Sequence, residues 1–313
     1  MRFKPSEALR FLGGLAAIVI LLGLVVLRVT SCAPLPAPPP GATGPGPAPA
    51  PPPVESGETR DGGCQGGPTG AAAANARSLR TLAWSPFGRA ETGWETYAPL
   101  VEREIGTGCD PATPGFARAL ADWQGRRQLP PDGVLSDPVF AQLKGVVQLR
   151  RPFVRVRQGD VCPAAPAAER LTWADASEGY GGKLVQLRTG ALAAYRRMAA
   201  AARADDPRIA ADPRNLTIFS GFRSPEYDAA RCAKEHNCNG IVRATCSPHR
   251  TGLAMDLYVG QAPGFEPDSS ADPNRLFMSR TPTYRWLVAN ADRYGFLPYP
   301  FEPWHWEWTG EAP

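Results

Sequence analysis

A proline-rich segment separates residues 1–32 from the rest of this chain. Between residues 33 and 53, eleven of the 21 residues are proline, and most of the others are Ala or Gly. Proline fixes φ and lacks a backbone N–H, and Ala and Gly add little apolar surface, so this stretch cannot form a packed core. We expect an extended, polyproline-like spacer. Gly-rich sequence continues beyond it, and we assign residues 33–77 to a linker.

The segment before the spacer carries a short apolar run. Residues 11–27 hold no charge and are rich in Leu, Val, Ile and Gly, and Arg2, Lys4 and Arg10 precede them. This run is at the lower limit for a membrane span, and its basic flank predicts a cytoplasmic N-terminus. We favour an uncleaved membrane anchor. The alternatives are a lipoprotein signal ending at Cys32 and a cleaved signal peptide. Each of the three would export the remaining chain.

Cysteine usage agrees with export. The chain has seven cysteines, and setting aside Cys32 leaves six. An even number suits three disulfides in an oxidising compartment. We expect Cys64 to pair with Cys109, and the other four to pair among themselves. A metal site built from Cys232, Cys238 and Cys246 is the weaker interpretation, because their spacings are not the short ones typical of zinc ligands.

Composition limits the possible functions. At 313 residues the chain has room for about two domains beyond its N-terminal segments. Its net charge is +4, and its basic residues are scattered and mostly Arg, with only four Lys. No Gly-rich loop that would cradle a phosphate is present. We therefore expect no nucleic-acid partner.

Residues 78–149 have the pattern of a small helical domain. Phe116, Leu120 and Trp123 recur at helical spacing. A turn with Asp-Gly at residues 132–133 follows, and then Asp-Pro opens another helix. This order resembles peptidoglycan-binding-type helical domains. A generic three-helix module that only spaces the next domain is the alternative.

Residues 165–313 alternate helical and strand patterns. We expect a long helix with Leu184, Leu187, Ala191, Tyr195 and Met198 on one face. Strands are predicted at residues 216–220, 254–259 and 304–308, a helix at 284–294, and a turn at 298–303. Helices combined with short strands predict a compact α+β domain with a small antiparallel sheet.

Two of the three histidines in the chain lie near acidic residues in separate segments. His249 precedes Asp256 by seven residues, and Glu302 precedes His305 by three. Two imidazoles and one carboxylate can hold Zn²⁺ and leave a position for water, and a further Glu can accept a proton from that water. A single His is more often structural. We favour a metal site because Asp256 lies in an apolar predicted strand, where an unpaired carboxylate would be costly to bury.

The spacing of Glu302 and His305 permits this site without proving it. Residues three apart in an ideal strand face opposite sides, so both can approach one metal only if Pro303 bends the chain. An aromatic strand with incidental polar residues is the alternative. The three tryptophans that alternate with His305 and Glu307 are expected to pack in the core. Glu307 would either orient a ligand imidazole or be exposed to solvent.

The second half of the chain resembles the VanY-type zinc D-alanyl-D-alanine carboxypeptidases. Four motifs of that family occur here in order: Ser220-Gly221-Phe222-Arg223-Ser224, Ser247 through Asp256, Trp286-Leu287 with Asn290-Ala291 and Tyr294-Gly295-Phe296, and Glu302-Pro303-Trp304-His305. The resemblance implies zinc ligands His249, Asp256 and His305, with Glu302 as the catalytic base and Arg223 near the substrate.

Two further residues of these motifs are candidates for substrate binding. Arg223 would stabilise the oxyanion or hold a substrate carboxylate with its two-pronged guanidinium, and a structural ion pair is the alternative. Ser247 would either cap its loop or contact substrate.

The resemblance predicts an enzyme of the bacterial cell envelope. It would remove the terminal D-Ala from peptidoglycan stem peptides, using a zinc-activated water and Glu302 as the general base. An endopeptidase that cuts within stems or crosslinks is one alternative, and a non-catalytic wall-binding protein is another. Beyond stem peptides and the membrane, we predict no specific partner.

Overall fold

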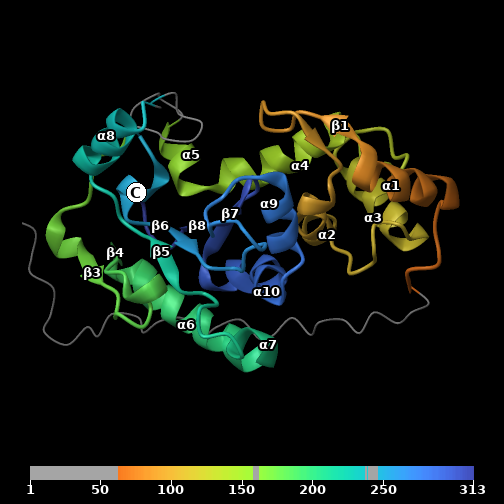
Figure 1. Cartoon of the computed structure of the whole chain (residues 1–313). Helices are drawn as coiled ribbons and strands as arrows, with labels where there is room; N and C mark the ends of the chain where they lie inside the picture. The colour runs from red at the N-terminus through yellow and green to blue at the C-terminus, as the bar shows by residue number, and fades with distance from the viewer. Residues whose placement is uncertain (1–62, 158–161, 237, 239–245) are drawn as a thin grey trace, which may run out of the picture. The chain divides into compact units, whose positions relative to one another are not determined.

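The computed structural model describes residues 63–157, 162–236, 238 and 246–313 (Figure 1). The predicted membrane segment and the proline-rich spacer lie outside these residues. Within the described part of the chain, no helix is both long and apolar enough to cross a membrane. The described residues belong to one compact unit, in which two hydrophobic clusters mark a helical region and a mixed region. The boundary between a helical domain and a catalytic domain stays a prediction.

The helical region contains the three predicted helices and one more. Its elements are α1 (Thr69–Thr81), β1 (Ala83–Trp84), β2 (Glu91–Thr92), η2 (Glu95–Tyr97), α2 (Ala98–Ile105), α3 (Pro114–Arg126) and α4 (Asp137–Arg150). Phe116, Leu120 and Trp123 are buried in its core, as their spacing predicts. Thr113 caps α3 by accepting a hydrogen bond from the backbone N–H of Phe116.

Helix α1 corrects the predicted linker, because residues 69–77 belong to this helix. The alanine-rich sequence has high helix propensity. Ala71 and Ala72 are buried with Ala117 of α3, where small side chains allow a close approach. Buried Asn75 also donates to the carbonyl of Gly133 (2.9 Å) and accepts from the N–H of Leu135 (2.9 Å). The first helix therefore fixes the predicted Asp-Gly turn.

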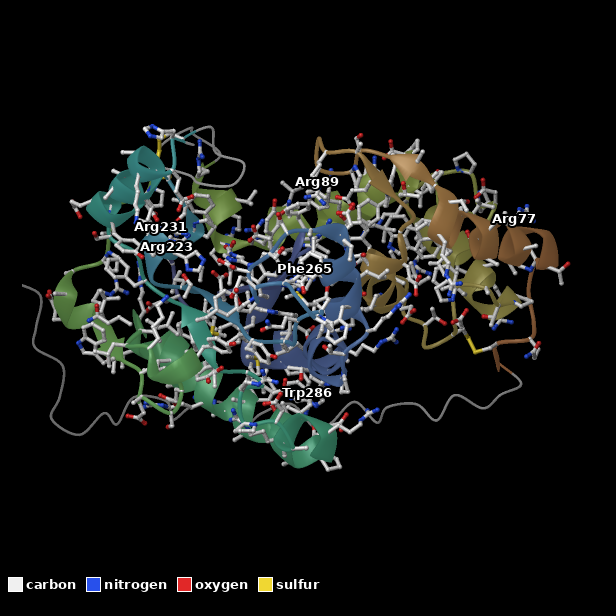
Figure 2. All side chains as sticks on the ribbon, in the orientation of Figure 1. Arg77, Arg89, Arg223, Arg231, Phe265 and Trp286 are labelled. Atoms are coloured by element: carbon white, nitrogen blue, oxygen red, sulfur yellow. A yellow bond between two sulfur atoms is a disulfide. The ribbon has the colours of Figure 1, made fainter. Side chains whose placement is uncertain are left out.

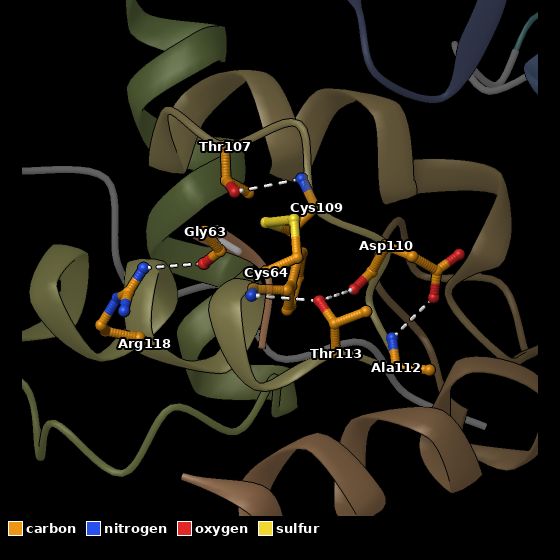
Figure 3. Close-up of a disulfide and its surroundings, with 9 residues drawn as sticks. Gly63, Cys64, Thr107, Cys109, Asp110, Ala112, Thr113 and Arg118 are labelled. Carbon is orange, nitrogen blue, oxygen red and sulfur yellow. Dashed lines mark hydrogen bonds between the residues drawn. A yellow bond between two sulfur atoms is a disulfide. The ribbon is translucent and has the colours of Figure 1, made fainter. Parts of the chain in front are cut away.

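Six cysteines form three disulfides, which include the predicted Cys64–Cys109 pair and join the other four among themselves. Cys64 bonds to Cys109 and fixes the segment before α1 to the loop between α2 and α3 (Figure 3). The remaining bonds join Cys162 to Cys246 and Cys232 to Cys238.

The mixed region has the predicted combination of helices and small antiparallel sheets. Its four-stranded sheet has the order β5–β6–β8–β7, and β3 and β4 form a separate hairpin. The strands are β3 (Leu171–Trp173), β4 (Gln186–Arg188), β5 (Ile218–Ser220), β6 (Ala254–Leu257), β7 (Phe296–Tyr299) and β8 (Glu302–Trp308). The helices are α5 (Pro152–Val156), η4 (Ala168–Arg170), η5 (Tyr180–Gly182), α6 (Thr189–Asp205), α7 (Pro207–Ala210), α8 (Pro225–Lys234), η6 (Pro248–Thr251), α9 (Asp272–Ser279), α10 (Pro282–Asn290) and η7 (Ala291–Tyr294).

The sheet packs against α6 and α10 to form the core of the mixed region (Figure 1). Tyr195 and Met198 of α6 are buried with Leu257 of β6 and Trp306 of β8. The hydroxyl of Tyr195 donates to the carbonyl of Leu216 (2.9 Å), just before β5. This core fixes the central strands β6 and β8.

Two predicted elements of the mixed region differ from the structure. The long helix begins at Thr189, so Leu187 lies on β4 and Leu184 is exposed. Leu187 still faces the core, which explains why the helical spacing was misleading. The predicted turn at residues 298–303 is shorter, because Pro298 belongs to β7. Proline is tolerated there since β7 is an edge strand.

Candidate metal centre and active site

Two neighbouring strands and one short helical turn bring His249, Asp256 and His305 together. Asp256 on β6 lies directly opposite His305 on β8 in the antiparallel register. The Asp256 carboxylate lies between the two rings: Oδ1 is 2.9 Å from Nδ1 of His305, and Oδ2 is 3.2 Å from Nε2 of His249. All three side chains are buried. The structure thus brings together the three residues that the sequence predicted as ligands.

The loop geometry around His249 follows from its neighbours in the sequence. Pro248 begins the turn η6, and Gly252 ends it in the left-handed conformation (φ 69°) with its N–H bonded to the carbonyl of His249. A Cβ on Gly252 would lie 3.1 Å from side-chain atoms of Arg188 and Leu171. Glycine therefore satisfies both the backbone conformation and the close packing here.

Burial and neighbouring charges give the two imidazoles different proton affinities. Burial, aided by the charge of Arg223, lowers the pKa of His249 to about 4. Burial also opposes the charge on His305, but its hydrogen bond with Asp256 and the negative charges of Asp256 and Glu307 outweigh this effect and raise its pKa to about 9. Burial alone would raise the pKa of Asp256, yet the two imidazoles hold it well below its usual range. An ionised carboxylate thus lies between two rings.

This set of donors fits a zinc ion. One donor atom from each of His249, Asp256 and His305 lies within 4.8 Å of the other two. Two imidazoles and a carboxylate are the donor set of many catalytic zinc sites. The second nitrogen of each ring faces an acceptor: His249 Nδ1 lies 2.8 Å from the carbonyl of Gly221, and His305 Nε2 lies 3.5 Å from Oε1 of Glu307. Such contacts orient metal-binding imidazoles.

Glu302 lies at the first position of β8, three residues before His305, and is half-buried. Burial raises the pKa of its carboxyl, and the nearby Asp256 carboxylate adds to the rise, while His305 and Arg223 oppose it. The pairing between β7 and β8 shifts register beside this residue, between Pro298 and Tyr299. The structure therefore places Glu302 within electrostatic reach of the ligands and of Arg223.

Arg223 and Ser247 meet at a buried carboxylate that the sequence analysis missed. Asp228 of α8 lies 2.9 Å from Nε of Arg223 and accepts a 2.7 Å hydrogen bond from the hydroxyl of Ser247 (Arg223 is labelled in Figure 2). Its side chain is 3% exposed. In sequence, Asp228 looked like an ordinary acidic residue of a first helical turn, where such residues stabilise the helix dipole. Arg223 also donates to Ser220 (3.0 Å).

Glu307 is buried, which excludes the solvent-exposed alternative. Its carboxylate accepts from Nε of Arg151 (2.8 Å) and from the backbone N–H of Phe153 (3.0 Å), and it faces His305. Burial would raise the pKa of Glu307, but the interactions with Arg151 and His305 outweigh this effect and lower the pKa to about 2. Its tryptophan neighbours Trp304 and Trp306 pack in the core, as predicted.

Comparison with known families agrees with this site. Residues 184–311 match the model of the VanY family, described as D-alanyl-D-alanine carboxypeptidase. This segment includes all six predicted site residues, and it indicates a peptidase of the carboxypeptidase type. No curated protein matches the chain. The likeness of residues 78–149 to peptidoglycan-binding domains stays a prediction.

Proposed function

We propose that this protein is a zinc-dependent D-alanyl-D-alanine carboxypeptidase that removes the terminal D-Ala from peptidoglycan stem peptides. The observation that carries the proposal is the buried cluster of His249, Asp256 and His305, which lies inside the segment that matches the VanY family. Glu302, with its raised pKa, supplies a proton acceptor beside that cluster.

Each side chain has a defined task in this reaction. Zinc held by the three ligands would polarise the scissile carbonyl and acidify a water molecule. Glu302 accepts a proton from the attacking water and delivers it to the leaving amine as the C–N bond breaks. Arg223, fixed by Asp228, binds the terminal carboxylate of the substrate or the developing oxyanion. A raised pKa suits Glu302 both to accepting the proton from water and to delivering it to the leaving amine.

The proposed location is the cell envelope. Three disulfides are typical of an oxidising compartment, and a stem-peptide substrate is found outside the cytoplasm. The helical region would hold the catalytic site near its polymer, and the N-terminal segment would anchor the chain to the membrane.

The test is mass spectrometry of a stem pentapeptide that ends in D-Ala-D-Ala, incubated with the full-length, zinc-loaded chain. We expect loss of one alanine. Glu302→Gln should slow that loss by about 10²–10⁴-fold, while Glu266→Gln, an exposed control, should match wild type. The same peptide with a C-terminal amide should be a poor substrate if Arg223 holds the carboxylate.

Two results would contradict the proposal. Release of fragments from crosslinked peptidoglycan, with the pentapeptide left intact, would make the protein an endopeptidase. Absence of cleavage in both substrates would favour a non-catalytic wall-binding protein.

A further inference from the structure

Arg151 lies outside the segment that matches the VanY family, yet its side chain reaches the metal centre. It lies directly before α5, in the connecting segment (residues 151–157) that leads from α4 into the mixed region, and its side chain is 5% exposed. Its guanidinium donates to Oε1 of Glu307 through both Nε (2.8 Å) and Nη2. A residue 156 positions before Glu307 thus holds the strand that carries His305.

The carboxylate of Glu307 joins Arg151 to the ligand ring. Its Oε1 accepts the hydrogen bonds of Arg151 on one side and lies 3.5 Å from Nε2 of His305 on the other. Its Oε2 accepts from the N–H of Phe153. Among the residues that the structure describes, His305 Nε2 is buried and has no hydrogen-bond partner. Glu307 is thus the acceptor toward which this ring nitrogen can donate.

Contacts with the Tyr299 ring also hold the Arg151 guanidinium and the His305 imidazole in place. The Arg151 guanidinium lies 4.3 Å from the centre of the Tyr299 ring, and that ring meets the His305 imidazole edge-on at 6.0 Å. Gln148 of α4 accepts from the remaining arm of Arg151. The planar guanidinium is therefore held on its face and on its edges, and Lys could not reproduce these contacts.

We propose that Arg151 is a positioning residue of the metal centre, which acts through Glu307 to hold the imidazole of His305 in its ligating orientation. The inference rests on the proposed zinc site. It makes the connecting segment a part of the metal centre, although that segment precedes the family-matched residues. Partners that orient metal-binding imidazoles typically contribute 10–100-fold to metal affinity.

The measurement is the zinc dissociation constant of the full-length chain, by competition with a chromogenic chelator. We expect Arg151→Gln and Glu307→Gln each to weaken zinc binding by about 10–100-fold, and Arg151→Lys to weaken it less. Because both act through one carboxylate, the double variant should lose less than the product of the two single losses. The visible spectrum of the cobalt-substituted protein should change in the same variants.

Arg275→Gln is the matched control. Arg275 is 1% exposed, and its guanidinium links Glu91 and Tyr97 of the helical region to the carbonyl of Phe301 (2.8 Å); within the described residues it makes no hydrogen bond or ion pair with Glu307 or with the three ligands. We expect Arg275→Gln to lower the thermal stability while zinc affinity stays within about twofold of wild type, because sites without shared contacts act almost independently.

Three outcomes separate the possibilities. If wild type binds no zinc, the proposed function and this inference fail together. If wild type binds zinc and Arg151→Gln binds it equally well, only this inference fails, because Arg151 is then merely structural. Should Arg151→Gln not fold, equal zinc affinity in Arg151→Lys and Glu307→Gln would overturn the inference.

Discussion

Replacing Asp228 by Asn tests how Arg223 is held for the substrate. Asp228 is buried, and its two oxygens face Nε of Arg223 and the hydroxyl of Ser247 at 2.9 and 2.7 Å. The amide of Asn has almost the same shape, so the change removes the negative charge with little loss of packing. Arg223 is left without its carboxylate partner.

The expected loss of stability can be worked out from these contacts. Leaving one partner of a fully buried ion pair uncompensated costs about 3–5 kcal/mol. The side chain of Arg223 is 17% exposed, so water recovers part of that energy. We expect a decrease of about 2–3 kcal/mol in the free energy of unfolding, together with a roughly tenfold rise in KM, because one mispositioned charge-assisted contact is worth about 1.5 kcal/mol or more.

Urea denaturation and the D-Ala release assay measure the two effects on the same preparation. Asp212→Asn is the control, since Asp212 forms an exposed pair with Arg214 away from the site. An Asp228→Asn variant with the stability and KM of Asp212→Asn would refute the role that we give to this carboxylate.

Three more predictions concern pH, backbone and metal. Burial raises the pKa of Glu102 from 4.5 to about 7, so the folded state holds this proton more tightly than the unfolded state. The free energy of unfolding should therefore fall by on the order of 2–3 kcal/mol as the pH rises between these two values. Thermal melts should show that Glu102→Gln removes this pH-dependent loss and that Glu104→Gln on the same helix does not. Gly252→Ala should lower the free energy of unfolding by about 1–2 kcal/mol because of backbone strain. The loss should exceed that of Gly106→Ala, because Gly106 has a similar φ but no neighbouring atoms where its Cβ would lie. Equal losses in the two variants would show that crowding at Gly252 is unimportant. Chelation should lower Tm, and zinc at about 1,000 times its Kd should restore about 4 kcal/mol; calorimetric scans that are identical with and without chelator would contradict a bound metal.

The sequence predicts the local parts of this site well. The residue types of His249, Asp256, His305 and Glu302, and the order of their motifs, were sufficient to select the three side chains that the structure brings together. The α+β class also followed, because helical and alternating patterns are local properties.

The parts that the sequence did not predict depend on contacts between distant segments. The pairing of Asp256 with His305 is a matter of strand register, and the partner of Glu307 comes from Arg151, far from it in the chain. Asp228 was overlooked for the same reason, since its burial arises only when α8 packs against the loop that carries Ser247. Local periodicity also misplaced Leu187, whose strand faces the same core as the following helix.

The most direct test of the central claim is to titrate the metal-free, full-length protein with zinc while measuring D-Ala release from the stem pentapeptide. The account predicts activity that rises to a plateau at one zinc per chain, and no such rise for a variant that carries His249→Ala. Full activity in the metal-free protein, or equal activity in His249→Ala, would contradict the assignment of His249, Asp256 and His305 as the catalytic zinc site.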